Sequence, residues 1–224
     1  VADVESALAN NGEVALFTWS GVSYIAKAGE IAVYASEEGS TTVRGIVENS
    51  TALKSATVAD GIEVVGNRTF RRCYELESVV LPSTLTEIAS GAFQSCTKLT
   101  NVTIPAGVTT IGEGAFSECT ALTSINIPDG VTRLEKDVLR ATGLVSVEIP
   151  ASVDYIGMYA FRDCEKLTEI TILSPSFTIG SSAFTNMAAP YPNFTIKVVN
   201  EDMKTYLDSV LTTHEKSYIT VVVM

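Results

Sequence analysis

The chain repeats itself about every 23 residues, and this periodicity constrains its fold more than any other feature. From Leu76 onward, five segments share one pattern: LESVVLP, LTNVTIP, LTSINIP, LVSVEIP and LTEITIL. The prolines of the first four lie at positions 82, 105, 128 and 150, so successive copies are 23, 23 and 22 residues apart. A unit this short cannot enclose its own apolar face, so its copies must stack against one another.

A second block recurs between these segments: VVGNRTFRRC (64–73), EIASGAFQSC (87–96), TIGEGAFSEC (110–119) and YIGMYAFRDC (155–164). β-Branched residues before each proline predict a short strand, which the proline ends because it cannot donate to a sheet ladder. The Ala-Phe pair predicts a short helical turn whose Phe points inward. Gly112 permits either a positive φ or a close approach of two backbones.

Stacking these units predicts a solenoid with a parallel β-sheet on one face and turns and short helices on the other. Short strand candidates at 14–19, 22–26 and 30–34 do not fit the repeat register and predict a β cap over the first coil. We expect one continuous unit in three segments, an N-terminal β-rich cap at 1–57, repeats at 58–189 and a C-terminal cap at 190–224.

The fourth copy, RLEKDVLRATGLVSVEIP (133–150), departs from the pattern. It is one residue short, replaces Ala-Phe with Val138-Leu139, and has no cysteine. Two interpretations are open. The copy is either a degenerate coil tolerated by its neighbours or a kink or bulge that shapes a binding surface.

The four cysteines occupy one position of the repeat, at Cys73, Cys96, Cys119 and Cys164. A repeated inward position favours cysteine as a small buried hydrophobic residue. Disulfides between successive coils are the alternative, but side chains stacked in parallel point the wrong way for that bond. No C-x-x-C pair occurs, so the sequence supports a zinc site even less than it supports disulfides.

Composition argues against several classes of function. The chain has 15 Lys and Arg against 26 Asp and Glu, a net charge of −11, which disfavours nucleic acid as a partner. Its one histidine, His214, lies in a polar stretch and is expected at the surface. No catalytic or nucleotide-binding motif is present, so we expect no enzyme activity, no metal and no cofactor. No apolar run approaches the ~18 to 20 residues that span a bilayer.

The pattern L-x-x-I-x-I-P…I-G-x-x-A-F-x-x-C resembles the BspA-like leucine-rich repeat over about residues 58–184. The resemblance implies a leucine-rich-repeat solenoid in a secreted or surface-exposed bacterial protein, and family members include adhesins and host-matrix binders. The stretch 197–206 is similar to the strand plus helix that ends many members, although it lacks their usual proline.

Strand alternation predicts the solvent-facing side chains, which are the candidate binding residues. One column comprises Val80, Thr103, Asn126, Glu148 and Thr171. The column beside it comprises Ser78, Asn101, Ser124, Ser146 and Glu169. These side chains are mostly small and polar, and acidity rises toward the C-terminal coils.

We therefore expect a non-enzymatic recognition or adhesion module, extracellular or at the cell surface. It would bind a protein or glycoprotein of a host or neighbouring cell through this face. A structural spacer, or a polysaccharide-binding accessory module of a larger envelope protein, is the alternative. The expected state is a monomer that does not span a membrane.

Overall fold

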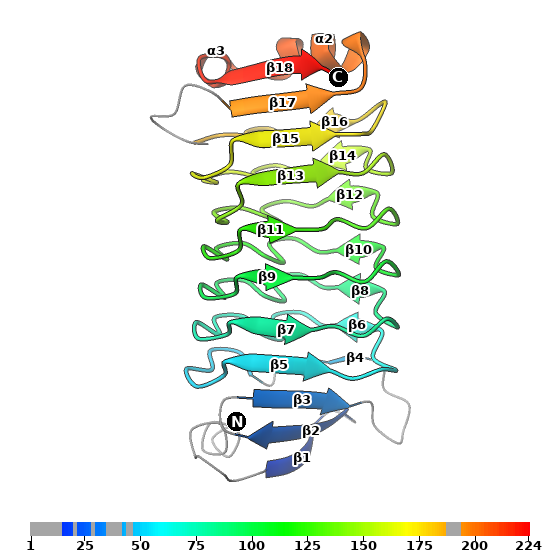
Figure 1. Ribbon diagram of the computed structural model, residues 1–224, viewed down its shortest axis with the longest axis vertical. Coiled ribbons are helices and arrows are strands. Elements are labelled where there is room, and N and C mark those ends of the chain that lie inside the picture. The colour runs from blue at the N-terminus through cyan, green and yellow to red at the C-terminus, as the bar shows by residue number, and fades with distance from the viewer. Residues whose placement is uncertain (1–14, 20–21, 28–29, 35–41, 44–46, 187–193) are drawn as a thin grey trace.

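The protein is an elongated parallel β-solenoid whose coils stack along one axis (Figure 1). The computed structural model describes residues 15–19, 22–27, 30–34, 42–43, 47–186 and 194–224. Pairings between successive coils are parallel and follow the repeat, as where Asn101 pairs with Ser124 and Val102 with Ile125. The predicted fold class is confirmed.

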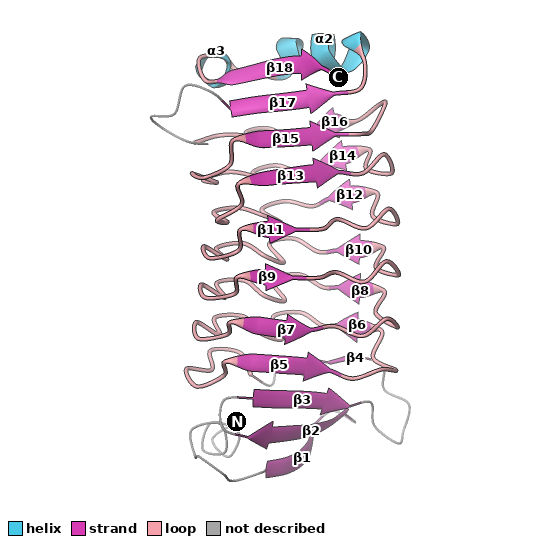
Figure 2. Cartoon of the chain, in the orientation of Figure 1, coloured by secondary structure: helices cyan, strands magenta, loops and turns pink. Residues whose placement is uncertain are grey.

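One side of each coil carries a strand of two to five residues, and we call these the front strands (Figure 2). They are β5 (Ser55–Val58), β7 (Ser78–Val80), β9 (Asn101–Val102), β11 (Ser124–Ile125), β13 (Ser146–Ile149), β15 (Glu169–Ile172) and β17 (Phe194–Val198). Their residues alternate between exposed and buried, as in β13. One face of this stack therefore faces solvent and the other lines the interior.

The opposite side carries two-residue back strands. They are β4 (Thr42–Val43), β6 (Val64–Val65), β8 (Glu87–Ile88), β10 (Thr110–Ile111), β12 (Arg133–Leu134), β14 (Tyr155–Ile156) and β16 (Thr178–Ile179). The segments after them, expected as short helices, are successive turns in the described coils. Gly114 and Glu118 have positive φ, whereas a right-handed helix needs negative φ throughout.

Phenylalanines fill the interior as a column. The rings of Phe70 and Phe93 stack with centroids 5.2 Å apart, and those of Phe93 and Phe116 with centroids 5.3 Å apart. These separations are close to the ~4.8 Å spacing of strands, so the rings repeat with the backbone. Leu139 takes the position in the fourth copy, after which Phe161 stacks on Phe184 at 5.9 Å.

The cysteines form a second internal column, and all four are buried free thiols, as predicted. Each donates to a carbonyl of the preceding coil, as Cys119 Sγ does to Phe93 O at 3.1 Å. Burial raises the pKa of Cys119 to about 12, so this thiol stays protonated at neutral pH. In the fourth copy Thr142 stands in the column, with its Oγ1 3.3 Å from Cys164 Sγ.

Different elements continue the stack at its two ends. β1 (Ala15–Trp19), β2 (Val22–Lys27) and β3 (Glu30–Tyr34) pair antiparallel, and β3 then pairs parallel with β5. At the other end β17 pairs with β18 (Ile219–Val223), beside α2 (Glu201–Val210) and α3 (Thr213–Lys216). The predicted terminal strands and the C-terminal strand plus helix are present. The division at residues 57 and 189 stays a prediction, and residue 189 lies outside the described residues.

Side-chain caps fix the C-terminal helices. Asn200 Oδ1 accepts from the Met203 N–H at 2.8 Å at the start of α2. Before α3, Thr212 Oγ1 accepts from the Glu215 N–H while Glu215 Oε2 accepts from the Thr212 N–H. Both arrangements satisfy backbone donors that have no partner within the first helical turn.

Candidate binding surface

The predicted binding residues share one solvent-facing surface, which we call the sheet face: the outward side chains of the front strands β5 to β15. Exposed members are Ser78, Val80, Asn101, Thr103, Ser124, Asn126, Ser146 and Glu148. Glu169 and Thr171 are half-buried. The register places Ser146 beside Glu169 and Glu148 beside Thr171. The structure thus brings the residues together, and their binding role stays a prediction.

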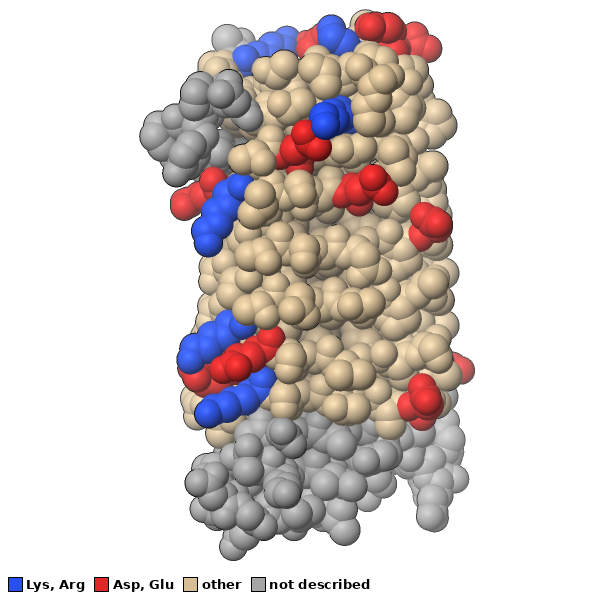
Figure 3. Space-filling model, viewed as in Figure 1, with Lys and Arg blue, Asp and Glu red and all other residues tan. Residues whose placement is uncertain are grey.

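The middle of the sheet face is uncharged. In Figure 3, charged side chains lie along its edges and toward the C-terminal end, and the centre is free of them. At the C-terminal end Lys197 Nζ lies 2.8 Å from Glu169 Oε2. Lys197 therefore offsets the negative charge of Glu169, one of the two acidic residues behind the predicted rise in acidity. The other, Glu148, has no ion pair among the described residues.

Asn126 belongs to the strand ladder rather than to a free polar surface. Its Oδ1 accepts from the Ile104 N–H at 2.8 Å, and its Nδ2 donates to Ile104 O at 2.7 Å. The side chain thus takes the place of a neighbouring backbone where the β9–β11 pairing ends. A ligand that used this amide would have to break two hydrogen bonds.

Apolar side chains also project from this side of the molecule. Val80 is 60% exposed within the sheet face, and Val145 is 49% exposed directly before β13. Sequence reasoning missed Val145, although a signal was present. The other copies have Glu77, Thr100, Thr123 and Thr168 at that position. The fourth copy alone has an apolar residue there.

A notch lies at Gly143, where the fourth copy lacks a residue. Elsewhere two residues separate the Cys position from the following Leu, whereas Gly143 alone separates Thr142 from Leu144. The resulting hollow is about 300 Å³ and is lined by Thr120, Ala141, Thr142, Gly143, Asp163, Glu165 and Lys166. β12 pairs with β14 and β13 with β15, but neither pairs with a strand of the preceding coil. Backbone hydrogen bonds such as Val145 N–H to Thr123 O still join the copy to that coil, so it keeps its place in the stack.

The described residues offer little for catalysis or metal binding. Among them, no group of three or more His, Cys, Asp and Glu side chains is placed to hold a metal ion. Burial raises the pKa of the thiols of Cys96, Cys119 and Cys164, and a protonated buried thiol is a poor nucleophile. The side chain of His214 lies outside the described residues. None of the described helices has the length and apolarity required to cross a bilayer.

A family model agrees with this geometry. The model of the BspA type leucine rich repeat region matches in six copies, over residues 46–153 and 86–210. The chain belongs to the BspA-type leucine-rich repeat family. The predicted resemblance is thereby confirmed, and the match extends beyond the residues 58–184 that carried it. No curated protein sequence matches the chain significantly.

Solved structures of three bacterial proteins have a fold similar to that of this chain. The T. pallidum protein TpLRR is 18% identical with a TM-score of 0.65, covering 88% of this chain and 96% of that chain. A protein from Eubacterium ventriosum is 20% identical with a TM-score of 0.53, covering 85% of this chain and 45% of that one. The pneumococcal vaccine antigen PcpA is 19% identical with a TM-score of 0.51, covering 96% and 49%. This chain thus spans nearly all of the first and about half of the other two, and these identities show the fold alone.

Proposed function

We propose that this BspA-type protein is a non-enzymatic recognition module that binds a protein or glycoprotein through the sheet face. The observation that carries the proposal is the uncharged centre of that face (Figure 3), which lies on short parallel ladders that pair β5 with β7, β9 with β11 and β13 with β15. The family is commonly found in surface interaction proteins. One structural neighbour is a vaccine antigen, which supports a location outside the cell or on its surface.

The chemistry of the sheet face suits a protein partner. Charged residues are depleted in the cores of protein interfaces, because burying them costs more free energy than burying neutral polar groups. Thr103, Ser124 and Ser146 offer hydroxyls that donate or accept, and Val80 offers an apolar contact at the same surface. Because the ladder fixes the strand backbones, binding would order little more of the protein.

A matched pair of substitutions tests the proposal. Thr103→Lys places a charge in the centre of the sheet face. Thr109→Lys makes the same change at an exposed threonine outside it, on the turn that leads to β10. Purified wild-type protein is first screened against host matrix proteins and glycans by biolayer interferometry, and both variants are then measured on each partner found.

The expected result is a protein or glycoprotein partner whose affinity falls about tenfold or more with Thr103→Lys, since an unpaired charge would be buried at the interface. Thr109→Lys should change the affinity less than twofold. Equal effects of the two variants would place the interface elsewhere. Binding to free polysaccharide alone would favour the accessory role, and no partner in the screen would favour a structural spacer.

A further inference from the structure

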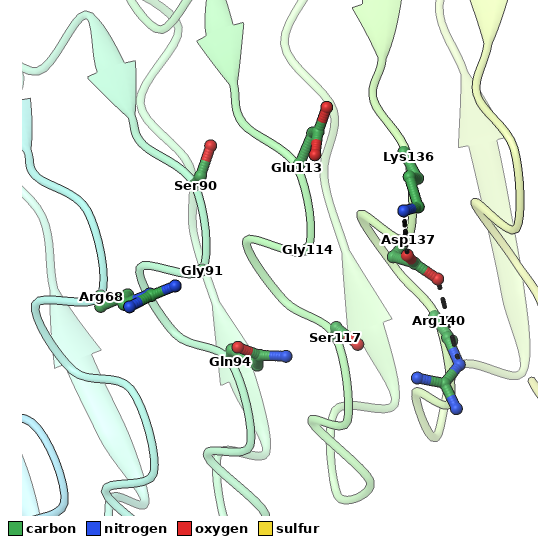
Figure 4. Close-up of a pocket in the computed structure, with 10 residues that line it drawn as sticks. All are labelled: Arg68, Ser90, Gly91, Gln94, Glu113, Gly114, Ser117, Lys136, Asp137 and Arg140. Carbon is green, nitrogen blue, oxygen red and sulfur yellow. Dashed lines mark ion pairs between the residues drawn. The ribbon is translucent and has the colours of Figure 1, made fainter.

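A polar groove runs across the turns that follow the back strands, and it does not include the sheet face (Figure 4). Its volume is about 250 Å³. Arg68 flanks it at one end and Lys136, Asp137 and Arg140 at the other, with Gly91 and Gly114 between them (Figure 4). The groove is therefore bounded by charged side chains and open where the glycines have none.

The repeat explains why the hollow occurs here. Two positions per coil have positive φ, and the first of them is occupied in turn by Arg68, Gly91, Gly114 and Asp137. Glycine in two successive coils removes side chains that the flanking coils retain. Three residues further along, Ser117 is likewise smaller than Arg140 of the next copy. In the coil of Gly114, two neighbouring positions thus both carry small residues.

Two hydrogen-bond donors that have no partner in the described segments line this hollow. Gln94 Oε1 accepts from Arg71 Nε at 2.9 Å, which leaves its Nε2 to donate into the groove, as Figure 4 shows. Ser117 is only 2% exposed, and its Oγ has no hydrogen-bond partner within the described part of the chain. Buried polar atoms are normally paired, so an orphaned hydroxyl beside a cavity points to a missing ligand group. Contact between this hydroxyl and a ligand requires a change to another staggered χ1 rotamer.

The balance of charge identifies the ligand group. Asp137 lies 3.9 Å from Lys136 Nζ and 4.0 Å from Arg140 Nε, so its charge is already compensated. Arg68, in the coil before Gly91, and Glu113, directly before Gly114, have no ion pair among the described residues. A ligand that satisfies both has an anionic group for Arg68 and a donor for Glu113.

We propose that this groove binds a hydroxylated carboxylate, the chemistry of an acidic sugar. The carboxylate accepts from Arg68, from Gln94 Nε2 and from the Ser117 hydroxyl, while a hydroxyl of the ligand donates to Glu113. Pockets that enclose a whole drug-sized ligand run from roughly 300 to 1,000 Å³. A groove of about 250 Å³ therefore accommodates a single sugar unit at the surface. The net charge of −11 disfavours a polyanion and leaves a singly charged unit.

The probe is sodium glucuronate, followed by ¹H–¹⁵N correlation NMR of the full chain. Glucose supplies the hydroxyls alone, acetate supplies the carboxylate alone, and sodium chloride matches ionic strength. Glucuronate should produce saturable shifts centred on the amides of Gly91, Gly114 and Ser117. Glucose and chloride should not, and acetate should bind at least about fivefold more weakly because it lacks the hydroxyl.

Arg68→Gln and Arg72→Gln form a matched pair, because both arginines are exposed on the turns, both have φ of 58°, and neither has an ion pair among the described residues. Arg68→Gln should weaken glucuronate binding about tenfold or more, since it removes a charge-assisted hydrogen bond. Arg72→Gln should change it less than twofold. Absent or unsaturable shifts, equal shifts with chloride, or equal effects of the two variants would overturn the proposal. Acetate as tight as glucuronate would overturn the sugar-acid assignment.

Ser117→Ala separates ligand binding from folding. Removing an unpartnered buried hydroxyl should leave the free energy of unfolding unchanged or raise it, while glucuronate affinity falls about fivefold. Unchanged affinity would exclude the hydroxyl from the site and overturn the assignment. The test does not depend on the sheet face, so a result on one surface leaves the other to be judged by its own experiment.

Discussion

The regular and irregular copies of the repeat fold into the same stack but have different interiors. Three regular copies end at Cys73, Cys96 and Cys119, and the irregular one is the fourth copy at 133–150. The former contribute stacked phenylalanines and buried thiols. The fourth copy has Leu139 and Thr142 at those positions and one residue fewer. Its backbone still donates to the next coil, as the Leu139 N–H does to Ala160 O at 3.0 Å. Backbone hydrogen bonds therefore keep the coils in register. The side chains of the internal columns can differ between copies, and with them their contribution to stability and the shape of the surface.

The largest effect should come from the phenylalanine column. Phe93 is fully buried and stacks on a ring above and a ring below, so Phe93→Ala should lower the free energy of unfolding by about 4 kcal/mol. Leu139→Ala should cost about 3 kcal/mol, because it leaves a cavity but breaks no ring stacking. Urea unfolding followed by circular dichroism measures both values.

Thr103→Ala, at an exposed position, is the control and should stay within about 0.5 kcal/mol of wild type. If Leu139→Ala costs as much as Phe93→Ala or more, the ring column adds nothing beyond ordinary burial. The contrast between regular and irregular copies would then be one of shape alone.

The next effect is a pH dependence of the free energy of unfolding, which the thiol column should produce and Thr142, which does not titrate, should not. Burial raises the pKa of Cys119 to about 12, above the ~8.5 of an unfolded cysteine. Above pH 8.5 the unfolded chain loses this proton while the folded chain keeps it, so stability should fall by about 1.4 kcal/mol per pH unit for this thiol. Below that pH its contribution is constant.

Unfolding free energies at pH 8, 9 and 10 test this slope. Cys119→Ala should be less stable at pH 8 but should show a shallower fall toward pH 10. Tyr218, whose pKa is raised to about 12 chiefly by burial, adds a slope of its own only above about pH 10. Identical slopes for wild type and Cys119→Ala would mean that this thiol ionises in the folded protein.

Much of this architecture follows from the spacing of particular residues. Recurring Phe, Cys and Pro fix the inward positions, the strand ends and the stacking period, because each interior position repeats with the coil. The turns after the back strands escaped prediction because left-handed residues such as Arg68 and Asp137 carry no compositional signal. Stacking of neighbouring coils imposes those conformations, as where the Arg68 N–H donates to Ser90 O at 3.1 Å.

The candidate surface was less predictable for the same reason. Alternation correctly places Asn126 and Glu169 on the exposed side of the strands. The partners of these side chains, Ile104 and Lys197, lie more than twenty residues away in sequence and are set by coil register. The groove at Gly91 and Gly114 likewise depends on four adjacent coils, so no single copy reveals it.

Asn126 and Asn101 compare the copy that directly precedes the fourth one with the regular copy before it. Both asparagines lie on the sheet face, but only Asn126 bonds its amide to the backbone of the preceding coil. Asn126→Ala should cost about 1–2 kcal/mol, since two partly buried hydrogen bonds are lost. Asn101→Ala should remain within about 0.5 kcal/mol of wild type. Equal costs in thermal or urea unfolding would contradict a structural role for Asn126.

The smallest effect concerns Thr142, which replaces cysteine in the fourth copy. Its hydroxyl donates to Leu139 O at 2.9 Å, and the same carbonyl also accepts from Cys164 Sγ at 3.1 Å. Thr142→Val preserves the shape and leaves that carbonyl with a donor, so the loss should be about 1 kcal/mol rather than the larger cost of an unpaired buried group. Thr109→Val, the same exchange at an exposed site, should change stability by less than about 0.5 kcal/mol. Urea unfolding of the two variants decides the point. If they are equally stable, shape alone and not the hydroxyl makes threonine acceptable in the cysteine column.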